Sequence, residues 1–425
     1  MVTAASRERF DRISFKSCTA GVLLLSIFLM PYVSVSNNVS LRPDQILIPV
    51  YVILEIFILK VRIPKLVVDI ITVLAIFSII IPLISTVIFL MFNPQLSFVG
   101  TLHSIKELQN LLKPIIYILF GSILYFRISK NAFLFIIKTI IITISIASII
   151  LFLGFTSSFR TTVVSFYVNF YHLVSKAPSM HRFPGFLIQP ATAGMYTIIM
   201  LAISVVENLE WYLIFLVILT GFLANTKVFW FSLPLMFLYF IIYVKNAKNG
   251  YRNYDRKKRK ILKFIFVLIL VILSIYLIIN TKLYIKKMLD YIFGVISRDP
   301  LAGRGRNFVV KNTTKILNIS LYIGIGLNAF QEMLSNYGTW DSGIYYDVAF
   351  LGSIFPLLKY VFLFWIFAYI PDNQEERFIF LTLFIFLVVL NFGINSFYQE
   401  RVSDFLYAYI GYRLAYKTSR GGNRS

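Results

Sequence analysis

The sequence has almost nothing that could form a disulfide or hold a transition metal. Its 425 residues include one cysteine, Cys18, and three histidines. A single cysteine excludes an intramolecular disulfide, and so few thiol and imidazole groups leave little for a zinc-type site. A hard-cation site built from carboxylates stays open, but no spacing of acidic residues favours one. We therefore predict a protein without a bound metal or other cofactor.

Negative charge is scarce as well. The chain carries 19 acidic residues against 41 lysines and arginines, a formal net charge of +22. Nucleic-acid binding would account for such an excess in a soluble protein. Here, however, 58% of the residues are hydrophobic and the mean hydropathy is +0.79, whereas soluble domains are about 45–50% apolar. Basic loops beside an anionic membrane leaflet explain the charge more simply, so we expect membrane lipids and no nucleic acid as partners.

Apolar runs recur along the whole chain. About twelve of them predict an all-α, polytopic transmembrane helical bundle that forms a single integral membrane domain over residues 1–425. The first run follows a basic N-terminus but precedes no A-x-A cleavage site, so we interpret it as an uncleaved span. Several runs are shorter than the ~20 residues of a straight crossing, and we expect these to be tilted, broken or extended by turns. The runs are Ala20–Val35, Ile46–Leu59, Leu66–Phe92, Leu111–Phe126, Ala132–Phe155, Phe183–Val206, Trp211–Ala224, Phe229–Val244, Ile261–Asn280, Tyr346–Ile370, Phe378–Ile394 and Phe405–Tyr416.

The distribution of Lys and Arg predicts how these spans are oriented. Short loops rich in basic residues are retained on the cytoplasmic side, and such residues gather at Lys60–Lys65, Arg127–Lys130, Lys245–Lys260 and the C-terminus. We therefore expect a membrane protein with both termini in the cytoplasm. Residues 156–182 and 281–345 then form two larger loops on the outer face.

The second of these loops is unusually basic. It contains most of the polar stretch Ala302–Tyr346, around which we expect the rest of the chain to be organised. Its excess of lysines and arginines predicts an anionic ligand or contact with lipid headgroups. Apolar residues recur at helical spacing from Ile285 to Ile296. This spacing predicts a short amphipathic helix that lies in the membrane interface or packs on the bundle.

Two further polar stretches interrupt the apolar runs. In the first, Arg182 and Gln189 are seven residues apart, so on a helix both would face the same side. We expect Pro190 to remove a hydrogen bond one turn into this span. An interfacial arginine that reaches the headgroups and a proline kink used for packing would explain the same pattern. The second stretch, Gly221–Lys227, joins two short spans.

Together, these stretches resemble the Wzy-type O-antigen polymerases and the related O-antigen ligases, membrane glycosyltransferases that act on undecaprenyl-diphosphate glycans. The resemblance rests on the order of loose motifs from Arg182 to Pro356 and on the hydropathy of the whole chain. Gln189 stands where the family usually has asparagine, Lys227 where it has arginine, and Asp341 where ligases tend to have histidine. The motifs are Arg182-Phe-Pro-Gly185 with Gln189-Pro190, Asn225-Thr226-Lys227, Gly303-Arg304, Gly324-Ile-Gly326-Leu-Asn-Ala-Phe330 and Asp341-Ser342-Gly343.

The resemblance implies a bacterial inner-membrane protein whose active site lies on the periplasmic side, in the loops 156–182 and 281–345. It also implies a bundle like that of C-type glycosyltransferases and a metal-independent transfer reaction. The growing glycan would pass from undecaprenyl diphosphate to the terminal sugar of another lipid-linked repeat unit, and a chain-length regulator protein would be a further partner. Guanidinium groups would stabilise the charge that develops on the diphosphate leaving group. The expected catalytic residues are Arg182, Arg304, Asp341 and Glu332, and the expected substrate-binding residues are Arg306, Lys227, Gln189, His181, Tyr345, Tyr346 and Arg298.

The acceptor hydroxyl needs a base, for which Asp341 is the first candidate, followed by Glu332 and His181. Asp341 could equally cap the following helix or pair with Arg304. The base therefore stays open among these acidic residues and the histidine.

Two other functions stay open. An O-antigen ligase would transfer the same glycan to lipid A core instead of to a second repeat unit. A transporter or flippase of the lipid-linked glycan, driven by ions, would use charges inside the spans, of which Glu55, Asp69 and Lys138 are candidates. These three residues also lie near the cytoplasmic ends of their predicted spans, where pairing or snorkelling would explain them.

Overall fold

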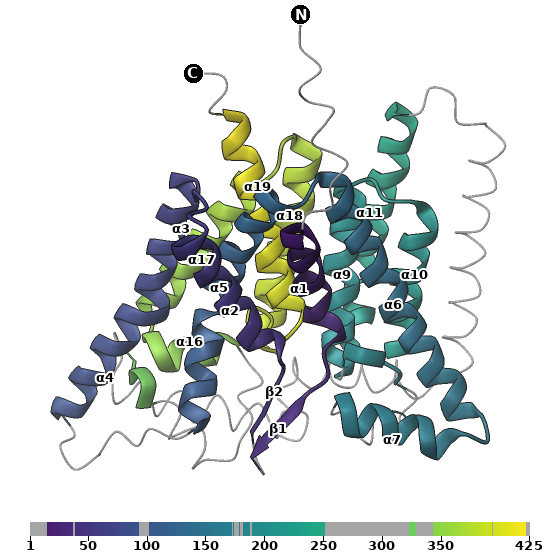
Figure 1. Cartoon of the computed structure of the whole chain (residues 1–425), viewed down its shortest axis with the longest axis horizontal. Helices are drawn as coiled ribbons and strands as arrows, with labels where there is room; N and C mark the ends of the chain where they lie inside the picture. The colour runs from purple at the N-terminus through teal and green to yellow at the C-terminus, as the bar shows by residue number, and fades with distance from the viewer. Residues whose placement is uncertain are drawn as a thin grey trace, which may run out of the picture. The chain divides into compact units, whose positions relative to one another are not determined.

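The computed structural model describes residues 15–36, 39–92, 102–171, 173, 178, 182–187, 189–250, 322, 324–328, 343–392 and 394–421. Within these residues the chain is almost entirely helical, with one two-stranded antiparallel hairpin (Figure 1). The chain divides into two compact units, Met1–Tyr239 with Ile316–Ser425, and Phe240–Lys315. The predicted span Ile261–Asn280 and the predicted amphipathic helix Ile285–Ile296 lie outside the described residues.

Helices of the N-terminal half largely coincide with the predicted apolar runs. The first run differs, because its helix ends at Leu29 and the chain then enters a strand at Val33. Pro31 and the alternation of valine and serine from Val33 to Ser36 favour extended backbone here. The elements are α1 (Phe15–Leu29), β1 (Val33–Ser36), β2 (Val39–Leu41), α2 (Asp44–Ile53), η3 (Leu54–Ile58), α3 (Lys65–Ala75), η4 (Ile76–Ile80), α4 (Ile81–Phe92), α5 (Leu102–Arg127), α6 (Lys130–Thr156) and α7 (Arg160–Tyr171).

The C-terminal half also departs from the predicted runs. In the run Phe183–Val206 the long helix begins only at Pro190. The run Tyr346–Ile370 forms two helices rather than one, because Gly352 between them has a φ of +79°, which ends the first helix. The elements are η5 (Gly185–Leu187), α9 (Pro190–Val206), α10 (Trp211–Ala224), α11 (Lys227–Gly250), η6 (Gly326–Asn328), α16 (Gly343–Leu351), α17 (Ile354–Tyr369), α18 (Gln374–Asn391) and α19 (Val402–Gly421).

Small residues bring α5 and α19 into close contact along the bundle. A Cβ added at Gly121 would lie 1.8 Å from the carbonyl oxygen of Ala408, and one at Gly411 would lie 2.1 Å from that of Ile118. Glycine is therefore required on both helices, as is common where membrane helices approach each other closely. In Figure 1, α1 begins and α19 ends at one end of the bundle, and the hairpin lies at the other.

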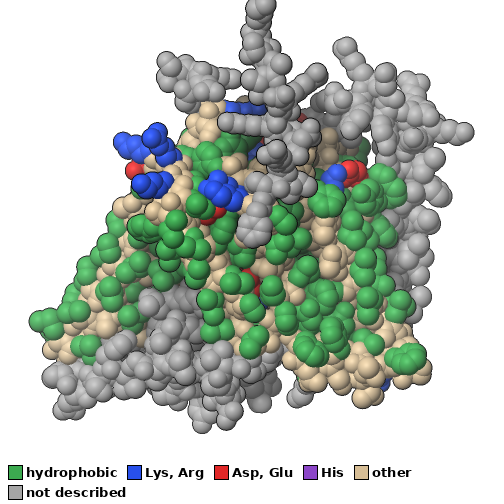
Figure 2. All heavy atoms as spheres, in the orientation of Figure 1, with side chains coloured by type: hydrophobic (Ala, Val, Ile, Leu, Met, Phe, Trp, Pro, Cys, Tyr) green, Lys and Arg blue, Asp and Glu red, His purple; other side chains and the backbone are tan. Residues whose placement is uncertain are grey.

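Helix α9 forms the centre of the core, since every residue from Thr192 to Val205 is buried. A helix that is apolar all round is surrounded by other helices. Among the residues that the structure describes, three helical stretches are long and apolar enough to cross a membrane: Lys65–Phe92, Lys130–Thr156 and Lys227–Val244. Hydrophobic side chains cover much of the face in Figure 2, and basic side chains gather over the start of α3.

Candidate functional site

The stretch around Arg182 does not form the helix that its spacing predicts. Gly185–Leu187 make a single 3-10 turn, and α9 begins only at Pro190, with Gln189 as its N-cap residue. Proline is well tolerated at the first position of a helix, because the N–H that it lacks would have no partner there. The predicted break within the span at Pro190 is therefore wrong, and Arg182 and Gln189 do not share a helix face.

Close contact with α6 explains the irregular backbone of this stretch. Gly185 has a φ of +59°, and a Cβ at this position would lie 2.8 Å from the backbone nitrogen of Ser148. The neighbouring Phe183 is buried, with its ring 5.3 Å from that of Phe152 in an edge-to-face contact. Arg182 itself is half-buried. Packing of its neighbours therefore holds the backbone of Arg182, while its side chain keeps access to solvent.

The second predicted stretch, Gly221–Lys227, packs directly against the first. The backbone N–H of Phe183 donates a hydrogen bond to the carbonyl oxygen of Leu223 at 2.9 Å. A Cβ at Gly194, one turn into α9, would lie 2.5 Å from Thr226 Oγ1. Thr226 Oγ1 also accepts a hydrogen bond from Phe229 N at 3.0 Å and so caps the start of α11. We call residues 182–190 and 221–227 together the rim stretches.

The junction between α10 and α11 shows why the short spans turn where they do. Asn225 ends α10 with a left-handed φ of +44°, which asparagine tolerates better than most residues. Its Oδ1 accepts a hydrogen bond from Trp230 Nε1 at 3.0 Å. Lys227 follows as the first residue of α11 and is exposed. This cation therefore lies at an accessible helix end.

The predicted Gly-x-Gly motif folds against α4 and α16. Gly324 and Gly326 both have positive φ, of +78° and +58°. Ile325 N donates to the carbonyl oxygen of Ala349 at 2.9 Å, and Leu327 N donates to Thr86 Oγ1 at 2.8 Å. Tight backbone turns thus require both glycines.

The remaining predicted site residues divide into two groups. On α16, Tyr345 precedes Tyr346, whose buried ring lies 5.1 Å from Tyr398 and 4.6 Å from Phe350. The other group falls outside the described residues, so its placement stays a prediction. This group comprises His181, Arg298, Arg304, Arg306, Glu332 and Asp341.

A segment that the sequence did not single out connects these regions. We call residues 398–404, which lead into α19 and form its first turn, the 398–404 segment. Gln399 Nε2 donates hydrogen bonds to Thr192 Oγ1 and, at 3.4 Å, to Gln189 Oε1. Tyr398 OH donates to Asp347 Oδ1 at 2.8 Å. The segment therefore links the rim stretches to the helix that carries Tyr346.

Arg401 and Asp404, further along the 398–404 segment, belong to a buried charge cluster. The other members of this buried charge cluster are Arg42, Asp44 and Lys113. All five residues are at most 1% exposed. Arg42 Nη2 lies 2.6 Å from Asp404 Oδ2 and 3.2 Å from Asp44 Oδ2, and Lys113 Nζ lies 3.9 Å from Asp404 Oδ1. Arg401 Nη2 donates to the carbonyl oxygen of Met30 at 2.8 Å. Charges from α2, α5 and α19 thus meet at the end of α1.

The polar atoms of this cluster are incompletely paired. Among the described residues, Lys113 Nζ, Asp404 Oδ1 and the Tyr117 hydroxyl have no hydrogen-bond partner. Burial raises the pKa of Asp44 to about 6, although Arg42 opposes the shift. Burial, followed by repulsion from Arg42, lowers the pKa of Arg401 to about 10. Burial in this cluster therefore disfavours the charged forms of Asp44 and Arg401.

A second buried network surrounds Asp347 on α16. Its Oδ1 accepts from Lys359 Nζ at 2.8 Å, and its Oδ2 accepts from Tyr360 OH at 2.6 Å. Tyr398 OH is a further donor to Oδ1, and Asn391 Nδ2 donates to Tyr360 OH at 2.6 Å. With several donors and a buried ammonium beside it, this carboxylate is well satisfied, which favours a role in holding α16, α17 and α18 together.

The charges that the transporter hypothesis would use are paired or exposed. Glu55 accepts hydrogen bonds from Arg127, including one from Nε at 3.0 Å. Lys138 pairs with Glu210, and both side chains are partly exposed. Asp69 is exposed. Pairing at helix ends, which the sequence allowed as an ordinary explanation, accounts for Glu55 and Lys138.

One signal in the sequence could have identified the buried charge cluster. Its residues lie beside or inside apolar runs: Arg42 and Asp44 precede the second run, Lys113 is inside the fourth, and Arg401 and Asp404 precede the last. Ionisable groups at such places face the bundle interior and pair with one another. What the pattern does not reveal is which of them pair.

Comparisons with protein families, with curated proteins and with solved structures found no match for this chain. Within the described part of the chain, no group of three His, Cys, Asp or Glu residues could hold a metal ion.

Proposed function

We propose that this chain is an integral membrane glycosyltransferase that polymerises lipid-linked oligosaccharide repeat units, as its resemblance to Wzy-type polymerases implies. The observation that carries the proposal is the 2.9 Å hydrogen bond from Phe183 N to the carbonyl oxygen of Leu223. It joins the stretch that contains Arg182 to the stretch that ends in Lys227, although two helices separate them in sequence. Two consecutive motifs of that family therefore lie side by side.

The chemistry of the rim stretches fits a diphosphate leaving group. As the bond between the sugar C1 and the phosphate oxygen breaks, negative charge develops on the phosphate, and a preorganised guanidinium stabilises it. Arg182 suits this role because packed neighbours fix its backbone while its side chain is only half-buried. Lys227 would add positive field, with Arg304 and Arg306 completing the grip. An acceptor hydroxyl, deprotonated by Asp341, would then attack C1.

A bacterial inner membrane is the expected location. We propose about twelve crossings, both termini in the cytoplasm, and residues 156–182 and 281–345 in the periplasm. The gathering of basic side chains over the start of α3 (Figure 2) supports this orientation, because basic residues are retained on the cytoplasmic side. The rim stretches would then lie at the periplasmic surface, where the lipid-linked donor is presented.

The acceptor distinguishes a polymerase from an O-antigen ligase. Both enzymes need cations for the same leaving group, so the arginines do not separate them. Asp341 and neighbouring tyrosines stand where ligases tend to have histidine, which favours the polymerase. A chain-length regulator protein would be a separate partner of the polymerase.

The decisive experiment uses the full-length protein in liposomes with undecaprenyl-diphosphate repeat units as the only glycan. We expect a ladder of products at multiples of one repeat, seen by gel electrophoresis and mass spectrometry. The proposal would be contradicted if the unmodified protein formed no ladder, or if a ladder formed with an Arg182→Ala variant but not with the unmodified protein. Glycan that appears on lipid A core, and only after that core is added, would identify a ligase.

The buried charge cluster supports a second candidate, an ion-driven transporter of the lipid-linked glycan. Buried ionisable groups inside a helical bundle, some of them with atoms that lack a hydrogen bond, are typical of proton and ion pathways. This candidate predicts that Lys113→Met abolishes movement of fluorescent lipid-linked glycan across liposomes, in protein that still folds. Equal movement with and without the protein, alongside a product ladder, would exclude it.

A further inference from the structure

Helix α7 begins where a candidate membrane span ends. The preceding helix α6 has 27 residues, or about 40 Å of helix, which exceeds the ~30 Å hydrocarbon thickness of a bilayer. Its last turns therefore reach the headgroup region. In Figure 1, α7 lies across the end of α6 instead of continuing it. The two helices touch closely, since a Cβ at Gly154 would lie 2.5 Å from Val163 Cγ1.

One face of α7 carries an exposed row of phenylalanines. Phe159, whose carbonyl accepts the first hydrogen bond of the helix from Val163 N at 3.0 Å, is 70% exposed. Phe166 and Phe170 follow, at 45% and 54%. At about 100° per residue, Phe166 and Phe170 each lie within about 20° of the direction of Phe159. The three rings therefore form a single stripe, which we call the phenylalanine stripe.

A different side of α7 is polar and exposed. Thr161, Thr162, Ser165 and Asn169 all lie on this side, and their helical positions centre about 110° from the phenylalanine stripe. A polar side and an apolar side on one short surface helix are the pattern of a helix that lies in the plane of a membrane interface.

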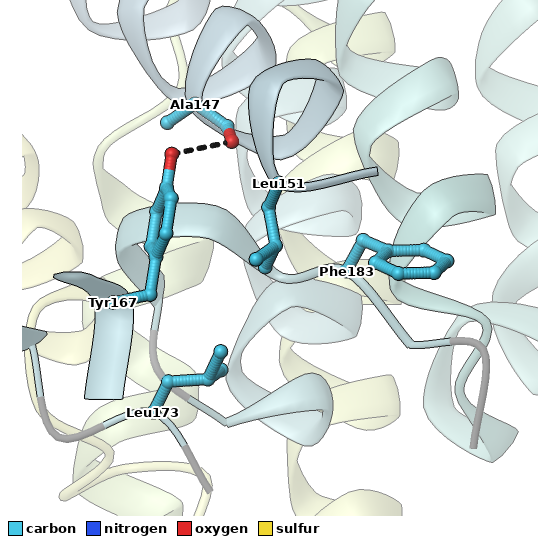
Figure 3. Close-up of a cluster of buried hydrophobic side chains, with 5 residues drawn as sticks. All are labelled: Ala147, Leu151, Tyr167, Leu173 and Phe183. Carbon is cyan, nitrogen blue, oxygen red and sulfur yellow. Dashed lines mark hydrogen bonds between the residues drawn. The ribbon is translucent and has the colours of Figure 1, made fainter. Parts of the chain in front are cut away.

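The third side of α7 holds the Arg182 stretch in place. Tyr167 is buried and its hydroxyl donates to the carbonyl oxygen of Ala147 at 2.7 Å. Tyr171 stacks on Phe186 with ring centroids 4.4 Å apart. Figure 3 shows Tyr167 and Phe183 on either side of Leu151, with the Tyr167 hydrogen bond to α6. The segment that follows Arg182 therefore rests on α7.

We propose that α7 is an interfacial helix, whose phenylalanine stripe enters the outer edge of the lipid hydrocarbon and thereby holds the Arg182 stretch at the level of the lipid headgroups. The occupant of the stripe is lipid, because α7 packs on α6, which is a candidate membrane span and keeps apolar side chains exposed in its last turns, with Leu153 57% and Ile150 49% exposed. A helix of this kind is buried by about 5–10 Å at the boundary between headgroups and acyl chains.

The depth of Arg182 in the membrane has a consequence for the proposed glycosyl transfer. This consequence rests in part on the proposed function. The diphosphate of a lipid-linked glycan lies at the headgroup level of the membrane that anchors it. An arginine held at that depth meets the phosphates without pulling the lipid out of the bilayer. The position of α7 itself, however, is independent of whether the chain is a transferase.

Site-directed nitroxide labelling tests the position of α7. Replacing the single cysteine by Cys18→Ser gives a background for four cysteine variants: Phe166→Cys and Phe170→Cys on the stripe, and Ser165→Cys and Asn169→Cys on the polar side. Each labelled protein, reconstituted into phosphatidylethanolamine and phosphatidylglycerol liposomes, is exposed to oxygen and to a water-soluble nickel chelate. We expect oxygen to relax the labels at 166 and 170 several-fold more than the chelate does, and the reverse at 165 and 169.

Other outcomes would overturn the proposal. Preference for the nickel chelate at all four positions would place α7 in water. Low accessibility of the labels at 166 and 170 to both reagents would mean that protein covers the stripe, either a second copy of the chain or another part of this one. Phe159→Cys provides a second reading of the stripe if either variant fails to fold. Because no readout depends on turnover, failure of the glycosyltransferase proposal would leave this result unchanged.

Discussion

The rim stretches and the buried charge cluster use the same kinds of side chain in opposite ways. In the rim stretches, Arg182 is half-buried and Lys227 is exposed. In the buried charge cluster, Arg42 and Arg401 are fully buried and their charges face carboxylates or backbone carbonyls. A cation that binds a lipid diphosphate must be accessible to that ligand. A cation buried among helix ends instead mainly stabilises the packing of those helices. Accessibility therefore separates the two roles better than residue type does.

Substitutions in the two regions are therefore expected to have different effects on stability and on turnover. Removing one partner of a buried ion pair leaves an uncompensated charge in the interior, which is strongly destabilising. Removing an accessible cation leaves water free to take its place, so stability changes little. Variants in the buried charge cluster should therefore lower stability, and variants in the rim stretches should lower turnover.

The largest effect on stability is expected for Asp404→Ala. Asp404 Oδ2 accepts from Arg42 at 2.6 Å and from the backbone N–H of Arg401 at 3.0 Å. Its loss leaves Arg42 with only the more distant carboxylate of Asp44 and removes the carboxylate next to Lys113. We expect the free energy of unfolding to fall by about 3–5 kcal/mol. Unfolding in detergent, followed by intrinsic tryptophan fluorescence, measures the change. Glu210→Ala, which breaks a partly exposed pair with Lys138, is the matched control at about 0–1 kcal/mol; equal losses in both variants would refute the distinction.

Arg182→Ala should lower turnover by about 10²–10³-fold, the effect of losing one preorganised charge stabiliser. Its free energy of unfolding should fall by less than that of Asp404→Ala, because Arg182 is half-buried whereas Asp404 is fully buried. Arg182→Lys should restore activity only in part, because the bidentate guanidinium is lost. Arg377→Ala, at an exposed arginine near the start of α18, serves as control. Turnover near normal in Arg182→Ala, measured by formation of the product ladder at equal protein levels, would remove Arg182 from the site.

Asp44→Asn should change how stability depends on pH. The folded pKa of Asp44 is raised from 3.8 to about 6, so the folded protein binds this proton more tightly than the unfolded chain does. Its contribution to stability is fully present below about pH 4 and is lost as the pH rises through about 6. Up to about 3 kcal/mol is involved, because one pKa unit corresponds to about 1.36 kcal/mol.

The measurement is the difference between unmodified protein and Asp44→Asn in unfolding curves from pH 4 to pH 8. We expect the unmodified protein to lose stability relative to the variant as the pH rises. A difference that is constant across this range, or one of opposite sign, would mean that Asp44 is not the group that titrates in the buried charge cluster.

The smallest effect tests the link between the two regions. Gln399 donates to Gln189 and Thr192 on one side, and its neighbours in the 398–404 segment reach the buried charge cluster on the other. Gln399→Ala should cost about 0.5–1.5 kcal/mol of stability, the usual net value of such hydrogen bonds. Gln374→Ala, at an exposed position that begins α18, should be neutral. If the two variants have the same free energy of unfolding, the hydrogen bonds of Gln399 do not couple the rim stretches to the buried charge cluster.

Local sequence features were good guides to helices and to the turn between α10 and α11. Long apolar runs became helices because they can satisfy their backbone hydrogen bonds within one segment. The predicted break at Pro190 was wrong, because a proline is equally compatible with a kink within a helix and with the first position of a helix. Which of the two occurs depends on the contact of Gly185 with α6, far away in sequence.

What the sequence by itself determined is the class of molecule: its abundance of apolar runs and its scarcity of acidic residues leave few alternatives to a helical membrane protein. Only the tertiary structure decided which charges meet. Arg42 and Asp404 pair across 362 residues of chain, and no periodicity in either neighbourhood indicates the other. The physical reason is that helix formation depends on neighbours three and four residues apart, whereas ion pairing in a bundle depends on how the completed helices pack.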